Sequence, residues 1–303
     1  MRNSLPSGTS MYLRARQTLF GLLGLLVMLP GAALAWGETG HRVVCQIAYE
    51  ELLPEARAEL DRLMAQDANY DSFAESCLFA DSPERIRWKD HFVNIPRSTR
   101  AITTLDCPLE ETCVLPSIRN DFLIILDPES TDAEKWLAIK LLGHWVGDVH
   151  QPMHVSFQDD RGANSNVIET LDFDDDYEDL NLHGVWDYTI IAHNYGDDYQ
   201  AISNMLRPVI TSEQKDAWRF DSPIEWANES YQITISPAAR YCVWQQGACW
   251  YTQDNMMLDT NEPWHTVQID VAYLEQHAET VRKRIQQAGV RLAQLLNQSL
   301  IVE

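Results

Sequence analysis

Two His-x-x-x-Asp pairs in apolar surroundings constrain the possible structure of this chain more than any other feature of its sequence. The first is His144 with Asp148 in the stretch LLGHWVGDVHQPMH, and the second is His183 with Asp187 in NLHGVWD. Side chains four residues apart project from one face of a helix. Together with the nearby His154 they form a nitrogen and oxygen ligand set that zinc prefers. A single pair of this kind is equally well explained as polar residues on the surface of a helix. Two pairs with a further histidine favour a metal site.

The first 35 residues predict a secretory signal peptide. Two arginines precede an apolar run from Leu19 to Leu29, and a small-x-small site ends at Ala35. The run is short for a membrane span, which leaves an uncleaved interfacial helix as the alternative. Cleavage after Ala35 would make Trp36 the new N-terminus. It would also take the formal net charge from −22 to −25, because the segment holds three arginines and no acidic residue. We therefore expect a secreted or periplasmic protein with no membrane attachment after cleavage.

Six cysteines agree with an oxidising compartment. No Cys-x-x-Cys pair occurs, so three disulfides are favoured over a cysteine metal site. Six cysteines permit fifteen pairings, and the connectivity stays open. Spacing suggests two short loops and one link between early segments: Cys107 with Cys113, Cys242 with Cys249, and Cys45 with Cys77.

Hydrophobic periodicity predicts a mainly α, single-domain protein over residues 36–303. The pattern predicts a loop over residues 81–113. It predicts an irregular region over residues 156–180, with a small β-hairpin or long loop near the site. The acidic run 172–179 is typical of a solvated turn, with divalent-cation binding as the rival. Helices are expected at residues 38–53, 54–66, 115–126, 132–151 (capped by Thr131), 183–193, 199–206, 224–235 and 267 to about 296, with a shorter element at 70–79.

The acidic composition argues against nucleic acid as a partner. A protein with a net charge of −22 does not attract phosphates through its overall field. Composition alone suggests a secreted enzyme with a neutral or cationic partner.

Three further residues are candidate ligands of additional metal ions. Asp81 lies in FADS, His91 in DHFVN, and His41 five residues after Trp36. Taken singly, each is better explained without a metal: Asp81 as a helix cap, His91 as an interior histidine with its hydrogen bonds satisfied, and His41 as a surface residue.

The mature chain resembles the secreted zinc-dependent single-strand nucleases, the family of mung bean nuclease. The resemblance covers nearly the whole of residues 36–303 and implies a helical phospholipase C/nuclease-type fold with three zinc ions. In that family nine residues hold the metals, beginning with an N-terminal tryptophan. Their counterparts here, in order, are Trp36, His41, Asp81, His91, His144, Asp148, His154, His183 and Asp187.

The same resemblance divides these ligands among the ions. It implies one zinc on Asp81, His91, His144 and Asp148, a second on His154, His183 and Asp187, and a third on Trp36, His41 and a bridging Asp148. Trp36 would bind through its freed amine, whose unperturbed pKa near ~8 lets zinc displace its proton. The three ions would also offset the negative field within the pocket.

By this resemblance the chain is an endonuclease that hydrolyses single-stranded DNA and RNA to 5′-phosphate products, with 3′-nucleotidase activity, as a monomer. A hydroxide shared by two zincs would be the nucleophile. Asp81 would orient the water or shuttle its proton, and Arg85 would contact phosphate. Base contacts would come from Phe92 by stacking and from Asn94, where several relatives have Asp. Asn164, in the counterpart of the family's Gly-Gly-Asn loop, is a further substrate-binding candidate.

Two alternatives stay open from the sequence. Zinc-dependent phospholipases C share the fold and the N-terminal tryptophan, but have a longer gap to the first histidine and a glutamate as the last ligand. A zinc-storing protein without catalysis is the other. The gap of five residues and Asp187 as the last ligand favour the nuclease.

Overall fold

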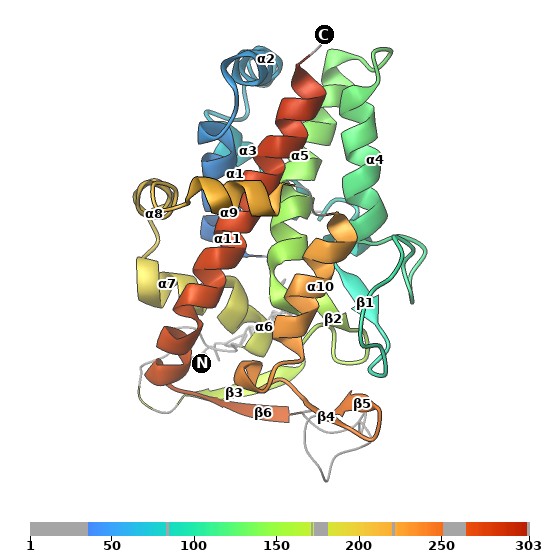
Figure 1. Ribbon diagram of the computed structural model, residues 1–303, viewed down its shortest axis with the longest axis vertical. Helices are drawn as coiled ribbons and strands as arrows, with labels where there is room; N and C mark the ends of the chain where they lie inside the picture. The colour runs from blue at the N-terminus through green and yellow to red at the C-terminus, as the bar shows by residue number, and fades with distance from the viewer. Residues whose placement is uncertain are drawn as a thin grey trace, which may run out of the picture. The chain divides into compact units, whose positions relative to one another are not determined.

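Helix α5 (Asp132–His150) lies at the centre of the fold (Figure 1). The computed structural model describes residues 36–82, 85–170, 172, 181–219, 222–250 and 265–301, all within one compact unit, Ala33–Glu303. Thr131 and Glu134 form a capping box at the start of α5, as the sequence predicts. Residues 138–150 are buried without a break. Polar side chains on this half of the helix therefore need partners inside the protein.

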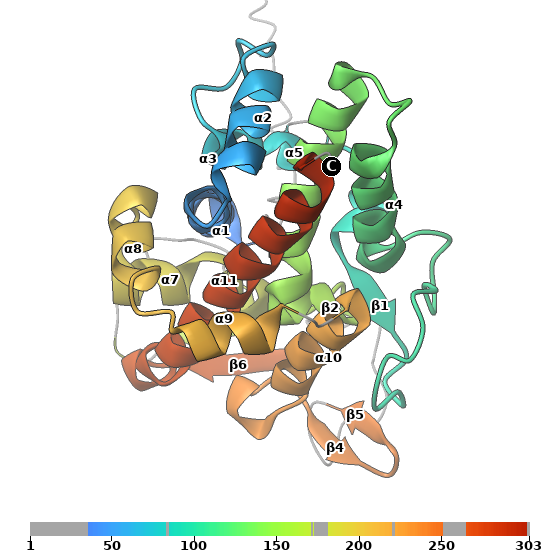
Figure 2. The same ribbon diagram turned by 45° about the horizontal axis from the view of Figure 1, so that its top comes forward.

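Four helices surround α5 and bury it (Figures 1 and 2). They are α1 (Gly37–Glu50), α4 (Val114–Leu126), α10 (Pro223–Thr234) and the long C-terminal α11 (Val271–Leu300). The other helices are α2 (Pro54–Met64), α3 (Phe73–Ser76), α6 (Leu182–Gly184), α7 (Ile190–Tyr195), α8 (Tyr199–Leu206) and α9 (Ser212–Trp218). The mainly α class is confirmed, while α9 was missed because no apolar stripe marks so short a helix.

Six short strands form three two-stranded sheets in the described residues. β1 (Val93–Ile95) pairs in parallel with β2 (Val155–Phe157), and β3 (Asn166–Thr170) in parallel with β6 (His265–Ile269). β4 (Val243–Gln245) and β5 (Ala248–Trp250) form an antiparallel hairpin. The sheets thus pair segments that are distant in sequence, apart from this hairpin.

The described part of segment 156–180 takes the long-loop form of the two that were expected, and its strand β3 pairs with the distant β6. The start of the C-terminal helix is corrected. The C-terminal helix does not begin at Val267. Val267 and Ile269 are buried between exposed neighbours, which is the alternation of a strand. The helix begins at Val271, after Asp270 caps it by accepting from the Tyr273 backbone N–H at 2.9 Å.

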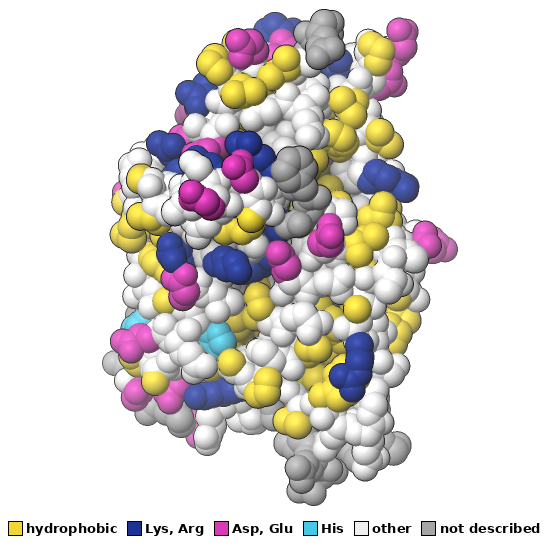
Figure 3. Space-filling view, in the orientation of Figure 1, with side chains coloured by type: hydrophobic (Ala, Val, Ile, Leu, Met, Phe, Trp, Pro, Cys, Tyr) yellow, Lys and Arg dark blue, Asp and Glu magenta, His cyan; other side chains and the backbone are white. Residues whose placement is uncertain are grey.

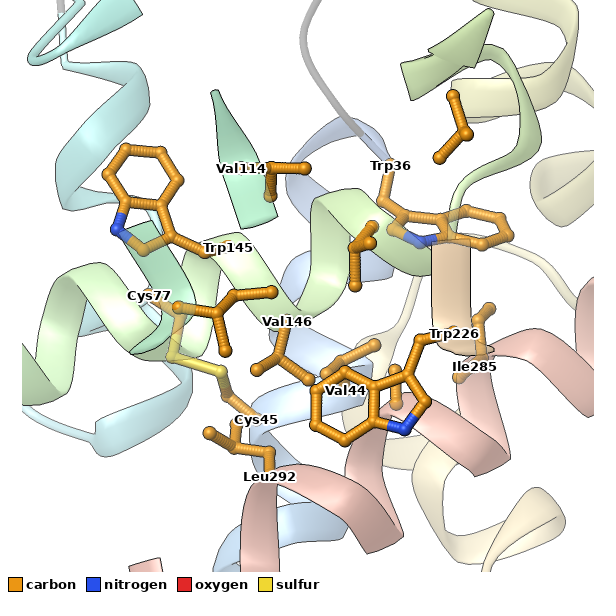
Figure 4. Packing of buried hydrophobic residues seen from close by; sticks show 14 of the residues in the cluster. Trp36, Val44, Cys45, Cys77, Val114, Trp145, Val146, Trp226, Ile285 and Leu292 are labelled. Carbon is orange, nitrogen blue, oxygen red and sulfur yellow. A yellow bond between two sulfur atoms is a disulfide. The ribbon is translucent and has the colours of Figure 1, made fainter. Parts of the chain in front are cut away.

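All six cysteines form disulfides, in the suggested pairs: Cys45–Cys77, Cys107–Cys113 and Cys242–Cys249. The Cys45–Cys77 bond lies in the core between α1 and α5 (Figure 4). It packs directly on Gly143, where an added Cβ would meet the Cys77 sulfur at 2.5 Å. Closing a loop of this length stabilises a fold by about 3–4 kcal/mol. The bond therefore fixes α1 and α3 against the part of α5 that carries His144.

Two sequence predictions fall outside the described residues. These are the signal peptide in residues 1–35 and most of the acidic run 172–179, of which only Asp172 is described. Asp172 accepts a hydrogen bond from the Val271 backbone N–H at 2.7 Å. Among the described helices, none is both long enough and apolar enough to span a bilayer.

Candidate metal centre

Seven elements bring eight of the predicted ligands together around the buried half of α5. They form three groups that could each hold a metal ion, with the candidate ligand atoms of a group within 4.8 Å of one another. The groups are His41, His144 and Asp148; Asp81, His91 and His144; and His154, His183 and Asp187. Besides α1, α5 and α6, the elements are η1 (Phe79–Asp81), η2 (Trp88–His91), η3 (Pro152–His154) and η4 (Val185–Thr189).

Local sequence explains how the ligands reach one another. Pro152 follows the end of α5 and turns the chain, so that His154 comes back beside the helix that carries Asp148. Glycine at 147 lets α1 approach closely, because an added Cβ there would meet His41 Nδ1 at 2.6 Å. η4, which carries Asp187, is a π-helical turn, a feature that is frequent at functional sites.

Four histidines are each anchored by one ring nitrogen to a backbone carbonyl, which can only accept. The Nδ1–H of His144 donates to Cys77 O at 2.7 Å, and Nε2–H of His91 donates to Ile86 O at 3.2 Å. His154 and His183 donate through Nδ1–H to the carbonyls of His91 and Gly162. These bonds fix the tautomers and leave the other nitrogen of each ring as a lone pair, as in metal-binding histidines.

The remaining lone pairs point at one another. His144 Nε2 lies 3.1 Å from His91 Nδ1, and His183 Nε2 lies 3.1 Å from His154 Nε2. Two unprotonated nitrogens at this distance repel unless a cation lies beside both. Ligand nitrogens in a tetrahedral zinc site are about 3.3 Å apart, given Zn–N bonds of about 2.0–2.1 Å. The spacing therefore fits a shared metal ion.

Asp148 lies between two of the groups. Its Oδ1 is 3.3 Å from His41 Nε2, and its Oδ2 is 3.2 Å from His91 Nδ1. Although the residue is fully buried, neither oxygen has a hydrogen-bond partner among the described residues. A buried carboxylate in this state is costly unless it is paired or coordinates a metal. The donor set thus fits divalent cations, with Asp148 able to serve two of them.

Burial favours the neutral, metal-binding form of three histidines of the centre but disfavours the charged form of Asp148. It lowers the pKa values of His91, His144 and His154 and keeps their rings neutral. It also lowers the pKa of His183, but the carboxylate of Asp187 outweighs burial and leaves that pKa raised. Burial raises the pKa of Asp148 well above its ordinary value, an effect that a bound cation opposes.

Trp36, the ninth predicted ligand, lies at the edge of the centre. It is fully buried at the N-cap of α1, and its backbone nitrogen donates to Asp187 Oδ1 at 3.1 Å. The nitrogen that would become a free amine therefore already lies against a candidate ligand.

The four predicted substrate contacts lie around the centre. Arg85 Nε is 3.6 Å from Asp81 Oδ1, and Phe92 is a partly buried ring directly after His91. Asn94 Nδ2 donates to Glu110 Oε1 at 2.9 Å, so one of its two amide hydrogens is used within the protein. Asn164 Nδ2 donates to Arg161 O at 2.7 Å, two residues from the carbonyl that anchors His183.

Gln151 was not predicted from the sequence to support the metal centre. Its Nε2 donates to Asp187 Oδ1, and its Oε1 accepts from the Met153 backbone N–H. One side chain thus holds Asp187 and the turn that leads to His154. Its position inside the HQPMH stretch was the only signal available.

A second missed set of residues supports His91 and His144. Trp145 packs edge-on against both imidazoles, at ring centroid distances of 4.8 and 5.4 Å. Its indole N–H donates to Asp121 at 2.7 Å, and Asp121 in turn is paired with Arg87 at 2.8 Å. No spacing rule links these residues, because they come from three separate segments.

Fold and site together define the class: a mainly helical protein with a buried histidine–aspartate cluster able to bind several metal ions. The chain belongs to the S1/P1 nuclease family, whose model matches residues 36–301. It is 29% and 27% identical to Endonuclease 2 and Endonuclease 3 of Arabidopsis thaliana, which covers 86% and 90% of this chain and 89% and 92% of theirs. It is 24% identical to Nuclease S1 of Aspergillus oryzae, over 86% of this chain and 91% of that protein.

Family membership makes the chain a nuclease, a hydrolase that cleaves phosphodiester bonds in nucleic acid. It confirms the predicted family. Since the matching family is that of the nucleases, the phospholipase C alternative is not retained.

Proposed function

We propose that the chain is a three-zinc endonuclease specific for single strands, acting on DNA and RNA to give 5′-phosphate products and also removing 3′-phosphates from mononucleotides. The observation that carries the proposal is the pair of imidazole contacts at 3.1 Å whose lone pairs face each other beside the unbonded carboxylate of Asp148. When bound, zinc ions supply Lewis acidity to phosphate oxygens and lower the pKa of water toward neutrality. Nine residues would hold them: Trp36, His41, Asp81, His91, His144, Asp148, His154, His183 and Asp187.

The chain's own groups would position the substrate around these ions. Arg85, which is partly exposed beside Asp81, would bind a non-bridging phosphate oxygen. Asp81 has one carboxylate oxygen without a hydrogen-bond partner among the described residues, and this oxygen would orient the attacking water or accept its proton. Phe92 would stack on the base next to the cleaved bond, while Asn94 and Asn164 would hydrogen-bond its edge.

The distribution of charge supports a local rather than a global attraction for phosphate. On the described surface visible in Figure 3, Lys and Arg side chains are interspersed with Asp and Glu and form no continuous basic stripe. Affinity would therefore depend on the pocket and on stacking. We expect a shallow dependence of the logarithm of KM on the logarithm of salt concentration, and a steep one would contradict this.

Export and cleavage after Ala35 would complete the site. The family match begins at Trp36, and the nitrogen of that residue lies 3.1 Å from Asp187. An amide nitrogen is not a zinc ligand under these conditions, whereas an amine is. The precursor would therefore bind fewer ions than the secreted or periplasmic form, which would act as a monomer.

The decisive experiment purifies the exported form and a matched form with Met-Gly left in front of Trp36. Mass spectrometry should find Trp36 at the N-terminus of the first, and elemental analysis should find three zinc ions in it and two in the second. Both are assayed on denatured DNA, duplex DNA, RNA, a 3′-mononucleotide and phosphatidylcholine. Equal zinc content in the two forms would refute the role of the amine. A fully loaded protein inert on all nucleic acids would refute the function.

A further inference from the structure

Trp88 is an exposed residue three positions before the candidate ligand His91. Its side chain is 56% exposed, and it is the one exposed tryptophan in the described part of the chain. A single exposed apolar residue needs no explanation by itself, so what surrounds Trp88 decides whether it has a role. Trp88 begins η2, the turn that ends with the candidate ligand His91. Its indole is therefore held three residues from the centre by a short, well-anchored element.

The exposed ring does not stand alone. Its centroid lies 5.7 Å from that of Phe92, with the two planes inclined at 55°. On the same turn, Lys89 Nζ lies 5.9 Å from the Trp88 ring centroid. Lys89 also lies 3.6 Å from Glu110, the carboxylate that receives the Asn94 amide. Two aromatic rings and a cation thus lie next to each other on the surface beside His91.

We propose that Trp88 is a second stacking position, which binds the base adjacent to the one on Phe92, with Lys89 beside the phosphate between them. Aromatic rings bind unpaired bases because an isolated base has free faces, whereas in a duplex each face is covered by its neighbour. Since the two planes are inclined at 55°, consecutive bases on them would be splayed apart rather than stacked on each other. The position would thus add to the preference for single strands. This inference about Trp88 rests on the proposed function and extends it to a second base of the substrate.

This arrangement predicts a dependence on substrate length. A 3′-mononucleotide has only one base, which would occupy Phe92. A single-stranded oligonucleotide would also use Trp88. Loss of the indole should therefore weaken binding of oligonucleotides selectively, whereas damage to η2 would displace His91 and impair every substrate alike.

The test compares Trp88→Ala and Trp88→Phe with the wild type on a 3′-mononucleotide and a single-stranded pentanucleotide. For Trp88→Ala, the KM of the pentanucleotide should rise about tenfold relative to that of the mononucleotide, the loss expected for one stacked base. Trp88→Phe should recover most of this. Anisotropy with a phosphorothioate pentanucleotide, which resists cleavage, should show the same loss in equilibrium binding. Lys89→Met should reduce the log-log slope of that binding against salt concentration by about 0.7, the contribution of one phosphate contact to a single strand, and an unchanged slope would overturn the role of Lys89.

Leu123→Ala provides the control, since Leu123 is a comparably exposed apolar residue on α4, 52% exposed. It should keep the wild-type ratio of the two KM values. An unchanged ratio in Trp88→Ala would overturn the inference, and so would equal losses on both substrates. If the wild-type protein cleaved neither substrate, the proposed function itself would fail, an outcome distinct from either of these.

Discussion

Two buried polar clusters meet at the C-terminal end of α5, and they differ in how completely their side chains are satisfied. One is the candidate metal centre. The other, which we call the arginine cluster, consists of His150, Glu229, Arg284 and Arg291. Arg291 binds Glu229 at 2.7 Å and His150 Nε2 at 2.8 Å, and Arg284 binds Ser230 at 2.7 Å and the His150 carbonyl at 3.1 Å. The two guanidinium groups share the carboxylate of Glu229, and their other contacts pair hydrogen-bond donors with acceptors.

The metal centre lacks this matching. Carboxylate oxygens of Asp81, Asp148 and Asp187 are buried without hydrogen-bond partners, whereas no side-chain atom of the four residues of the arginine cluster is in that state. A satisfied polar cluster rigidifies a core, but an unsatisfied one destabilises it until a ligand arrives. Burial and charge therefore do not distinguish these two clusters. They differ in the number of buried polar atoms that lack a hydrogen-bond partner.

The largest effect is expected for Asp148→Asn. Changes in residues that only support metal ligands cost about 10–100-fold in metal affinity or activity, so loss of a carboxylate shared by two groups should lower kcat/KM by more than about 100-fold. The metal-free protein should become as stable as the wild type or more so, because a buried unpaired carboxylate is replaced by an amide. Activity assays and thermal unfolding with chelator measure both. Destabilisation of the metal-free protein would contradict the comparison.

The opposite pattern is expected for Glu229→Gln. Breaking a buried ion pair costs about 3–5 kcal/mol, and the lower value applies here because the Glu229 side chain is 36% exposed. Denaturant unfolding should show a loss of about 3 kcal/mol with or without zinc. The kcat/KM per folded molecule should stay within about threefold of wild type. Arg219→Gln, which removes an exposed partner of Asp216, is the matched control and should change stability little.

An intermediate effect is expected for Gln151→Leu, which removes the side chain that joins Asp187 to the turn before His154. Zinc affinity, measured by competition with a chelator, should fall about 10–100-fold, as for other residues that orient metal ligands. Gln46→Leu, on the outer part of α1, should leave the affinity unchanged. An affinity equal to wild type in Gln151→Leu would show that Asp187 is held by other contacts.

The smallest effect concerns pH. In the metal-free protein, His91, His144 and His154 have lowered pKa values, so the unfolded chain binds more protons near its pKa of about 6.5 and stability is lost as pH falls through this range. His183 and Asp148, whose pKa values are raised, contribute in the opposite direction. The net loss from pH 7 to 6 should therefore be small, about 1 kcal/mol or less.

Within the arginine cluster, His150 adds to the loss near pH 6.5, because burial and the two arginines lower its pKa, whereas Glu229 responds in a lower range. Burial raises the pKa of Glu229, but Arg291 and Arg284 outweigh it and leave the pKa lowered, so this contribution is present above about pH 4.5 and is lost below it. Chemical unfolding from pH 7.5 to 4 in chelator separates the two ranges. A single loss confined to the lower one would contradict the assignment of neutral histidines.

The sequence predicted which residues gather in the candidate metal centre better than it predicted their surroundings, for a physical reason. Metal ligands are constrained in type and in spacing, so pairs such as His144 with Asp148 are recognisable four residues apart. No comparable pattern of residue type and spacing marks the arginine cluster in the sequence. Arg284 and Arg291 are of a residue type that is seldom fully buried, and only packing against α10 reveals that they are. Local pattern also failed at Val267, because strand pairing with β3 decided its structure.

The position of Trp36 has a practical consequence for recombinant production. Its backbone nitrogen lies 3.1 Å from Asp187 Oδ1, and the residue is fully buried. Under the proposed cleavage after Ala35, an affinity tag or a leftover protease-site residue in front of Trp36 would turn the freed amine back into an amide. Expression vectors should therefore place tags after α11 and keep residues 1–35 in front of Trp36.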